Sequence, residues 1–180
     1  MKRDFLKMLA PAALLTLAGI AGAATYTDAD VAGKAAHEIR MYSRYSIWDN
    51  VNLRVEGGEV ELSGQVSEPY KKQDLQRLVQ RTPGVTSVTN RLEVLPLSSF
   101  DDNLRWRVAR AVYGDPTLSR YALQAVPPIH IIVNNGRVSL EGVVSNEMEK
   151  NLAFMRASSA GLNFGAVQNN LRVEHPKAKS

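Results

Sequence analysis

The side chains best suited to bind a ligand are concentrated in residues 101–113, with the sequence DDNLRWRVARAVY. Arginine guanidinium groups pair with phosphate, and tryptophan and tyrosine rings settle at the level of lipid headgroups. A helix with these residue types on one face would suit an anionic phospholipid surface. The residues that we expect to form this lipid- or partner-binding face are Arg105, Trp106, Arg107, Arg110 and Tyr113.

The helical period decides which side of the helix each residue occupies. At ~100° per residue, the apolar side chains gather within about 100° of one another, which predicts the face that packs on the core. The members of that face are Leu104, Val108, Ala111 and Val112. Trp106, Arg110 and Tyr113 fall within about 60° of one another on the opposite side. Arg105 and Arg107 lie near its flanks.

Two interpretations of the aromatic residues on this helix stay open. Either Trp106 and Tyr113 contact lipid or a partner, or they pack against the first half of the chain across the short linker 96–99. At roughly 1 kcal/mol per basic residue near an anionic surface, three arginines contribute only about 3 kcal/mol. With a modest aromatic contribution, the Kd is of about millimolar order. Firm attachment would need self-association or a second contact.

Catalytic chemistry has little support in the sequence. The three histidines, His37, His130 and His175, fall on a predicted helix, a predicted strand and the tail, with no carboxylate at a recurring spacing. Ser63 and Ser139 lie near glycine but outside a G-x-S-x-G elbow. The chain has no cysteine, which excludes disulfides, thiolate metal sites and cysteine nucleophiles. We therefore expect a non-enzymatic binding protein with no catalytic residue, no metal and no cofactor.

Much of the positive charge belongs to the N-terminus. The 180 residues carry a net charge of +4, and half of it comes from residues 1–7, MKRDFLK. Residues 8–21 are apolar except for Thr16, and Ala-Gly-Ala at 21–23 fits a cleavage site. We predict a cleaved signal peptide over 1–23 rather than a membrane anchor, because the run is shorter than the roughly 20 residues of a spanning helix. The rest is nearly neutral, so we expect no nucleic-acid partner.

A repeat divides the remainder of the chain. The pattern G-x-V-x-L-x-G-x-V-S occurs at 58–67 and again at 136–145, at an offset of 78. The pattern V-x-N-x-L-x-V follows at 88–94 and at 167–173. Because a repeat at a fixed period marks duplicated structural units, we expect two domains and a flexible tail. Their predicted ranges are 27–95, 100–174 and 175–180.

Each copy has the same predicted order of elements. A helix begins at a candidate N-cap, Asp28 or Asp101. Two alternating strands follow, joined by a Gly-Gly or Asn-Gly turn that favours a tight hairpin. A second helix and a short strand close the unit. The fold class is therefore α+β, with two tandem α-β-β-α-β two-layer units, each a small three-stranded sheet with two helices.

Two further features recur in both copies. Gly64 and Gly142 interrupt the apolar row of the returning strand at the same place, which predicts a bulge or the close approach of a helix. Tyr45 recurs as Tyr121, in the connections that precede the hairpins. We interpret that repetition as shared packing within the fold.

The hairpin pattern, followed by a helix and the V-x-N-x-L-x-V strand, resembles the BON domain of bacterial osmotically inducible and nodulation proteins. The resemblance covers both copies, and with the signal peptide the chain is similar to the dual-BON periplasmic proteins. It implies an envelope location, attachment to phospholipid surfaces and, for some members, chaperone-like or stress-protective roles. The second copy departs from the pattern at Asn163-Phe164, where the usual Gly-Val is missing.

The resemblance and the residues together lead to one expectation for function. We expect a periplasmic, non-enzymatic protein for envelope maintenance or stress, which contacts anionic phospholipid through the second domain. The alternative is a chaperone-like or adaptor protein that binds unfolded proteins or envelope partners. The sequence leaves the oligomeric state open. Without a lipid-modified cysteine, any membrane contact must come from the folded surface.

Overall fold

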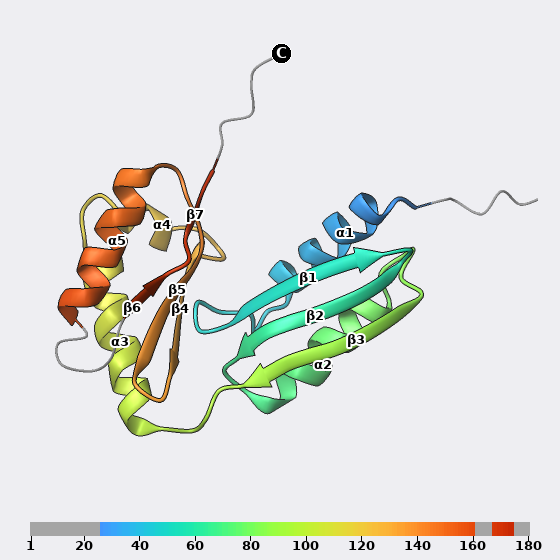
Figure 1. The fold of residues 1–180 in the computed structure, drawn as a ribbon, viewed down its shortest axis with the longest axis horizontal. Helices are drawn as coiled ribbons and strands as arrows, with labels where there is room; N and C mark the ends of the chain where they lie inside the picture. The colour runs from blue at the N-terminus through green and yellow to red at the C-terminus, as the bar shows by residue number, and fades with distance from the viewer. Residues whose placement is uncertain (1–25, 161–166, 175–180) are drawn as a thin grey trace, which may run out of the picture.

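The computed structural model describes residues 26–160 and 167–174, which form two α+β units in tandem (Figure 1). The predicted signal peptide and the predicted tail lie outside the described residues. The first unit contains α1 (Asp28–Met41), β1 (Asn50–Glu56), β2 (Glu59–Val66), α2 (Pro69–Gln80) and β3 (Ser87–Val94). The second contains α3 (Ser99–Tyr113), α4 (Ser119–Ala122), β4 (Ile129–Asn134), β5 (Arg137–Val144), α5 (Glu147–Ala160), β6 (Val167–Asn169) and β7 (Arg172–Val173).

The first unit confirms the predicted α-β-β-α-β order. Its sheet has the order β1-β2-β3, with β1 antiparallel and β3 parallel to the central β2. Both helices cover the same face of the sheet (Figure 1). The four-residue spacing along α1 buries Val31, Ala35 and Ile39, as expected for one helical face. The core lies between the helices and the inward residues of β2.

The second unit repeats this plan with two additions. The long connection before its hairpin forms the short helix α4, and the predicted single last strand is divided into β6 and β7. Both pieces run parallel to β5. Between them the backbone N–H of Asn170 still donates to the Leu140 carbonyl at 2.9 Å, so the chain keeps to the edge of the sheet.

The aspartates at the helix starts do not cap the helices, so that prediction is wrong. The side chains of Thr27 and Ser98 cap α1 and α3 instead. Asp28 accepts the backbone N–H groups of Gly57 and Gly58 at 2.9 and 3.0 Å. Asp101 does the same for the turn at 135–136, at 2.9 and 2.8 Å. A tight turn leaves adjacent N–H donors without strand partners, and a carboxylate in the first turn of the helix satisfies both.

Gly64 and Gly142 are required by a close backbone contact. Both have φ of +111°, and a Cβ at either would lie 2.1 Å from the Asn50 carbonyl oxygen or 1.9 Å from that of Pro128. The neighbour is thus the start of the preceding strand, and the expected approach of a helix is wrong. The same conformation in both units explains why the pattern keeps glycine at this place.

The two units touch through the loop between α1 and β1. The backbone N–H of Ile131 in β4 donates to the Ile47 carbonyl at 2.7 Å. The rings of Tyr45 and His130 lie 5.4 Å apart between centroids. Within the described residues, no helix is both long and apolar enough to cross a membrane.

Candidate functional site

The orientation of α3 decides which of the predicted side chains face solvent. Leu104, Val108 and Val112 are buried, as predicted. The fourth buried apolar position is Ala109, whereas the predicted Ala111 is only partly buried. Compared with the prediction, α3 is rotated so that Ala109 faces the core. This rotation removes some of the expected residues from the exposed face.

Arg105 is not on the exposed face, which corrects its predicted position. Its side chain is buried, forms an ion pair with Asp102, and donates from Nη2 to the Val133 carbonyl at 2.8 Å. The aliphatic part of an arginine side chain can lie along an apolar surface while its guanidinium group donates hydrogen bonds to acceptors beyond it. Arg105 thus ties α3 to β4 and is not placed to meet a ligand.

Tyr113 is also drawn inward. Its ring is partly buried against the core of the second unit, and its hydroxyl donates to the Ile129 carbonyl. Burial raises the pKa of Tyr113. The side chain is held by the protein, and we correct its predicted place on the open face.

Trp106 contacts the first unit, as one of the two interpretations expects, yet its side chain stays largely exposed. Its ring meets the ring of Trp48 from the first unit edge to face, with centroids 5.2 Å apart and planes at 70°. Even so, 59% of the residue's surface remains exposed. The contact with Trp48 therefore helps to orient this ring at the surface.

Two arginines share the exposed side of α3 with this ring. Arg107 and Arg110 are both exposed, and the Nε of Arg110 donates to the Trp106 carbonyl at 3.4 Å. We call Trp106, Arg107 and Arg110 the Trp106 face. It carries two positive charges and one large aromatic ring, which is the combination expected at a membrane interface. The first unit has Gly33 and His37 where the second has Trp106 and Arg110.

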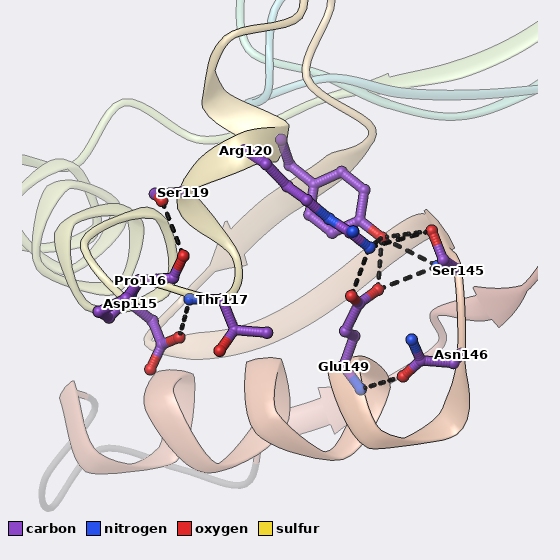
Figure 2. Close-up of polar contacts among 9 residues, drawn as sticks. Asp115, Pro116, Thr117, Ser119, Arg120, Ser145, Asn146 and Glu149 are labelled. Carbon is purple, nitrogen blue, oxygen red and sulfur yellow. Dashed lines mark hydrogen bonds and ion pairs between the residues drawn. The ribbon is translucent and has the colours of Figure 1, made fainter.

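A buried polar cluster that the sequence analysis missed braces the second unit (Figure 2). Glu149 of α5 pairs with Arg120 and accepts the Tyr121 hydroxyl at 2.6 Å. The Ser145 backbone N–H donates to the same hydroxyl oxygen at 2.9 Å. Burial raises the pKa of Glu149, but the hydrogen bonds from Tyr121 and Arg120 outweigh it and hold the pKa below its ordinary value.

The first unit has the same brace with the charges reversed. Lys71, which lies 78 positions before Glu149, donates to Asp49 at 2.7 Å and to Ser67 at 2.8 Å. The side chains of Lys71 and Asp49 are almost fully buried. The offset of the repeat could have revealed this pair of braces, because Lys71 and Glu149 occupy equivalent helix positions and carry opposite charges. In each unit the pair ties the second helix to the loop before the hairpin, which is a structural role.

The family model supports the repeat found in the sequence. The model of the BON domain matches residues 27–96 and 101–174. The chain belongs to the BON domain family. BON domains are associated with phospholipid binding and with envelope or stress roles. A search of curated proteins found no match.

Two solved structures are remotely similar to this pair of BON domains. The C-terminal domain of CdsD, a structural protein of the type III secretion system of Chlamydia trachomatis, is 15% identical, with a TM-score of 0.30. The match covers 83% of this chain and 100% of that one. A second CdsD structure is 16% identical with a TM-score of 0.29, covering 81% of this chain and 92% of that one.

The two described histidines, His37 and His130, lie on different elements. His37 is exposed on α1, His130 is buried on β4, and His175 lies outside the described residues. Burial is the main cause that lowers the pKa of His130, so the folded protein favours its neutral form. Across residues 26–160 and 167–174, no group of three or more histidine, aspartate or glutamate side chains is arranged to hold a metal.

Proposed function

We propose that this protein binds anionic phospholipid surfaces of the cell envelope through the Trp106 face of its second BON domain. The observation that carries the proposal is the state of Trp106: 59% of its surface is exposed, although one edge of the ring rests on Trp48. An exposed tryptophan whose orientation is already fixed loses little conformational entropy when it enters an interface. Its neighbours, Arg107 and Arg110, supply the charge that phosphate groups attract.

The distribution of charge favours the second domain as the contact. Residues 97–180 hold ten basic and seven acidic side chains, whereas residues 25–96 hold nine and ten. With Arg105 buried, two arginines remain on the face and contribute about 2 kcal/mol near an anionic surface. The expected attachment is therefore weak, reversible and sensitive to salt. Such binding suits a protein that exchanges between the membrane and the surrounding fluid.

The cellular location in this proposal is the periplasm. The predicted signal peptide over residues 1–23 would export the chain, and the family is associated with the envelope. The proposed activity is binding, without catalysis. It makes the protein a component of envelope maintenance or of the response to envelope stress.

Sedimentation with lipid vesicles tests the proposal. The mature protein is mixed with phosphatidylglycerol, cardiolipin or phosphatidylcholine vesicles, and the bound fraction is measured at low and high salt. We expect binding to the two anionic lipids, loss of most of it in Trp106→Ala, Arg110→Ala, and weakening by salt. The matched control is Tyr70→Ala, Arg77→Ala, which removes one exposed aromatic ring and one arginine from the first domain. Equal binding by both double variants would rule out the Trp106 face.

A second candidate function rests on a different surface. The outer side of α5 exposes Met148 and Met155, 68% and 58% accessible, where α2 has Tyr70 and Arg77. Flexible methionine side chains suit variable apolar partners, as a chaperone-like or adaptor protein would need. Suppression of aggregation of unfolded proteins, without lipid, is the test. If Met148→Gln, Met155→Gln suppresses aggregation as well as the unaltered protein, α5 is not the binding surface.

A further inference from the structure

A groove lies beside the Trp106 face, where the two domains meet. Its volume is about 400 Å³, within the range of sites that hold small ligands. Residues of the α1–β1 loop, α3 and the segment around α4 line it together. The lining residues are Ile47, Trp106, Ala109, Arg110, Tyr113, Gly114, Ala122 and Pro127.

The walls of this groove are fixed by contacts that do not depend on a ligand. The carbonyl of Ile47 accepts the Ile131 N–H at 2.7 Å, which holds the first-domain wall against the second domain. The hydroxyl of Tyr113 is tied to the Ile129 carbonyl, and the ring of Trp106 rests on Trp48. Because the walls are preformed, a ligand that fits would bind without first ordering them.

The hollow exists because small side chains lie between large ones. Ala109 and Ala122 face the groove from two helices, while Ile47 and Tyr113 supply its apolar walls. Among the described residues that line the groove, Arg110 is the one that carries a charge. Apolar walls with a single cation select an alkyl chain that carries a negative headgroup.

We propose that this groove binds one acyl chain of an anionic phospholipid, with the phosphate paired to Arg110. The inference deepens the proposed function and rests on it, because the lipid would come from the membrane that the Trp106 face touches. An acyl chain is favoured over an extended peptide because the described residues that line the groove lie in helices and loops, whereas strand addition requires a sheet edge. A chain held in this way is a second contact beside the electrostatic one, which strengthens attachment by effective concentration.

The test separates groove binding from surface binding. The probe is lysophosphatidylglycerol with a chain short enough to stay monomeric, followed by calorimetry or by NMR of the full mature protein. Ala122→Leu fills the groove from an exposed position and leaves every charge in place. Ala125→Leu is the control, since Ala125 is exposed in the same connection but does not line the groove. We expect saturable binding, roughly tenfold weaker for Ala122→Leu and unchanged for Ala125→Leu.

Three outcomes overturn the inference: no binding of the monomeric lipid, equal binding by both leucine variants, or a change in self-association as the only effect of Ala122→Leu. Circular dichroism and the unfolding midpoint confirm that both variants are folded. Arg110→Gln should weaken binding of lysophosphatidylglycerol more than that of lysophosphatidylcholine. If intact vesicles bind but the monomeric lipid does not, the groove proposal fails and the proposed function survives. If neither binds, both fail.

Discussion

Trp48 of the first BON domain supports Trp106 of the second, edge to face, with 5.2 Å between the ring centroids. The contact joins the loop before the first hairpin to the helix that carries the proposed lipid-binding face. The contact also makes the orientation of the Trp106 ring depend on how the two domains pack.

The first prediction concerns the two tryptophans themselves. An edge-to-face aromatic pair contributes about 1 kcal/mol beyond the area that it buries. A double-mutant cycle with Trp48→Leu and Trp106→Leu should therefore give a coupling of about that size in the free energy of unfolding, measured with urea. A coupling indistinguishable from zero would show that the two rings do not support each other in solution.

The second prediction is that acid weakens the junction through His130. Its ring lies against Tyr45, with Glu141 opposite in the β4–β5 ladder and Asp49 nearby. Burial lowers the pKa of His130 in the folded state, so the unfolded chain takes up a proton first as the pH falls below its ordinary value of 6.5. The stabilising contribution is complete above that pH and declines below it, by at most about 1.4 kcal/mol per pH unit.

Urea unfolding between pH 5 and pH 8 measures this dependence. His130→Gln should flatten the decline, because an amide does not titrate in this range. His37→Gln is the control, since His37 is exposed on α1. If both variants keep the same acid dependence as the unaltered protein, another group is responsible.

The third prediction compares the two buried braces. Lys71→Met leaves Asp49 buried with no cation, so we expect a loss of about 3 kcal/mol in the free energy of unfolding. Arg120→Met should cost less, because the Arg120 side chain is 55% exposed and Tyr121 still donates to Glu149. Denaturant unfolding of the two variants gives the comparison. A smaller loss for Lys71→Met than for Arg120→Met would contradict the assigned roles.

The fourth prediction contrasts two glycines. Gly142→Ala would place a Cβ 1.9 Å from the Pro128 carbonyl oxygen at a φ of +111°. We expect a loss of at least about 2 kcal/mol. Gly33→Ala, on the open side of α1 with nothing within 4 Å, should instead stabilise by up to about 1 kcal/mol. Thermal unfolding of the two variants should move in opposite directions, and a parallel shift would contradict the geometry.

The repeat made the order of elements predictable from the sequence. Alternation in the hairpins and the four-residue spacing of α1 gave the right elements because both are local patterns tied to one buried face. The split of the last strand into β6 and β7 was not predictable, since it depends on how this edge segment pairs with β5. The helix caps were misassigned because Asp28 and Asp101 bond to turns about 30 residues away.

The candidate site was predictable only in part. Helical spacing identified Trp106 and Arg110 as neighbours on an exposed side, and the structure keeps them there. Helical spacing misplaced Arg105, because a periodic pattern treats arginine as a surface residue. The pattern contains no information about the Val133 carbonyl, which accepts a hydrogen bond from the Arg105 guanidinium group. The support from Trp48 and the groove beside Ile47 both depend on how the two domains pack, which no spacing within one helix reveals.

The most direct test of lipid binding at the Trp106 face uses the protein's own fluorescence. The chain has two tryptophans, so Trp48→Phe leaves Trp106 as the single reporter. This variant is mixed with phosphatidylglycerol vesicles that contain brominated acyl chains, and the quenching of its emission is measured against vesicles without bromine. We predict quenching and a blue shift, reversed by high salt. Vesicle-bound protein whose Trp106 emission is neither quenched nor shifted would contradict the proposal.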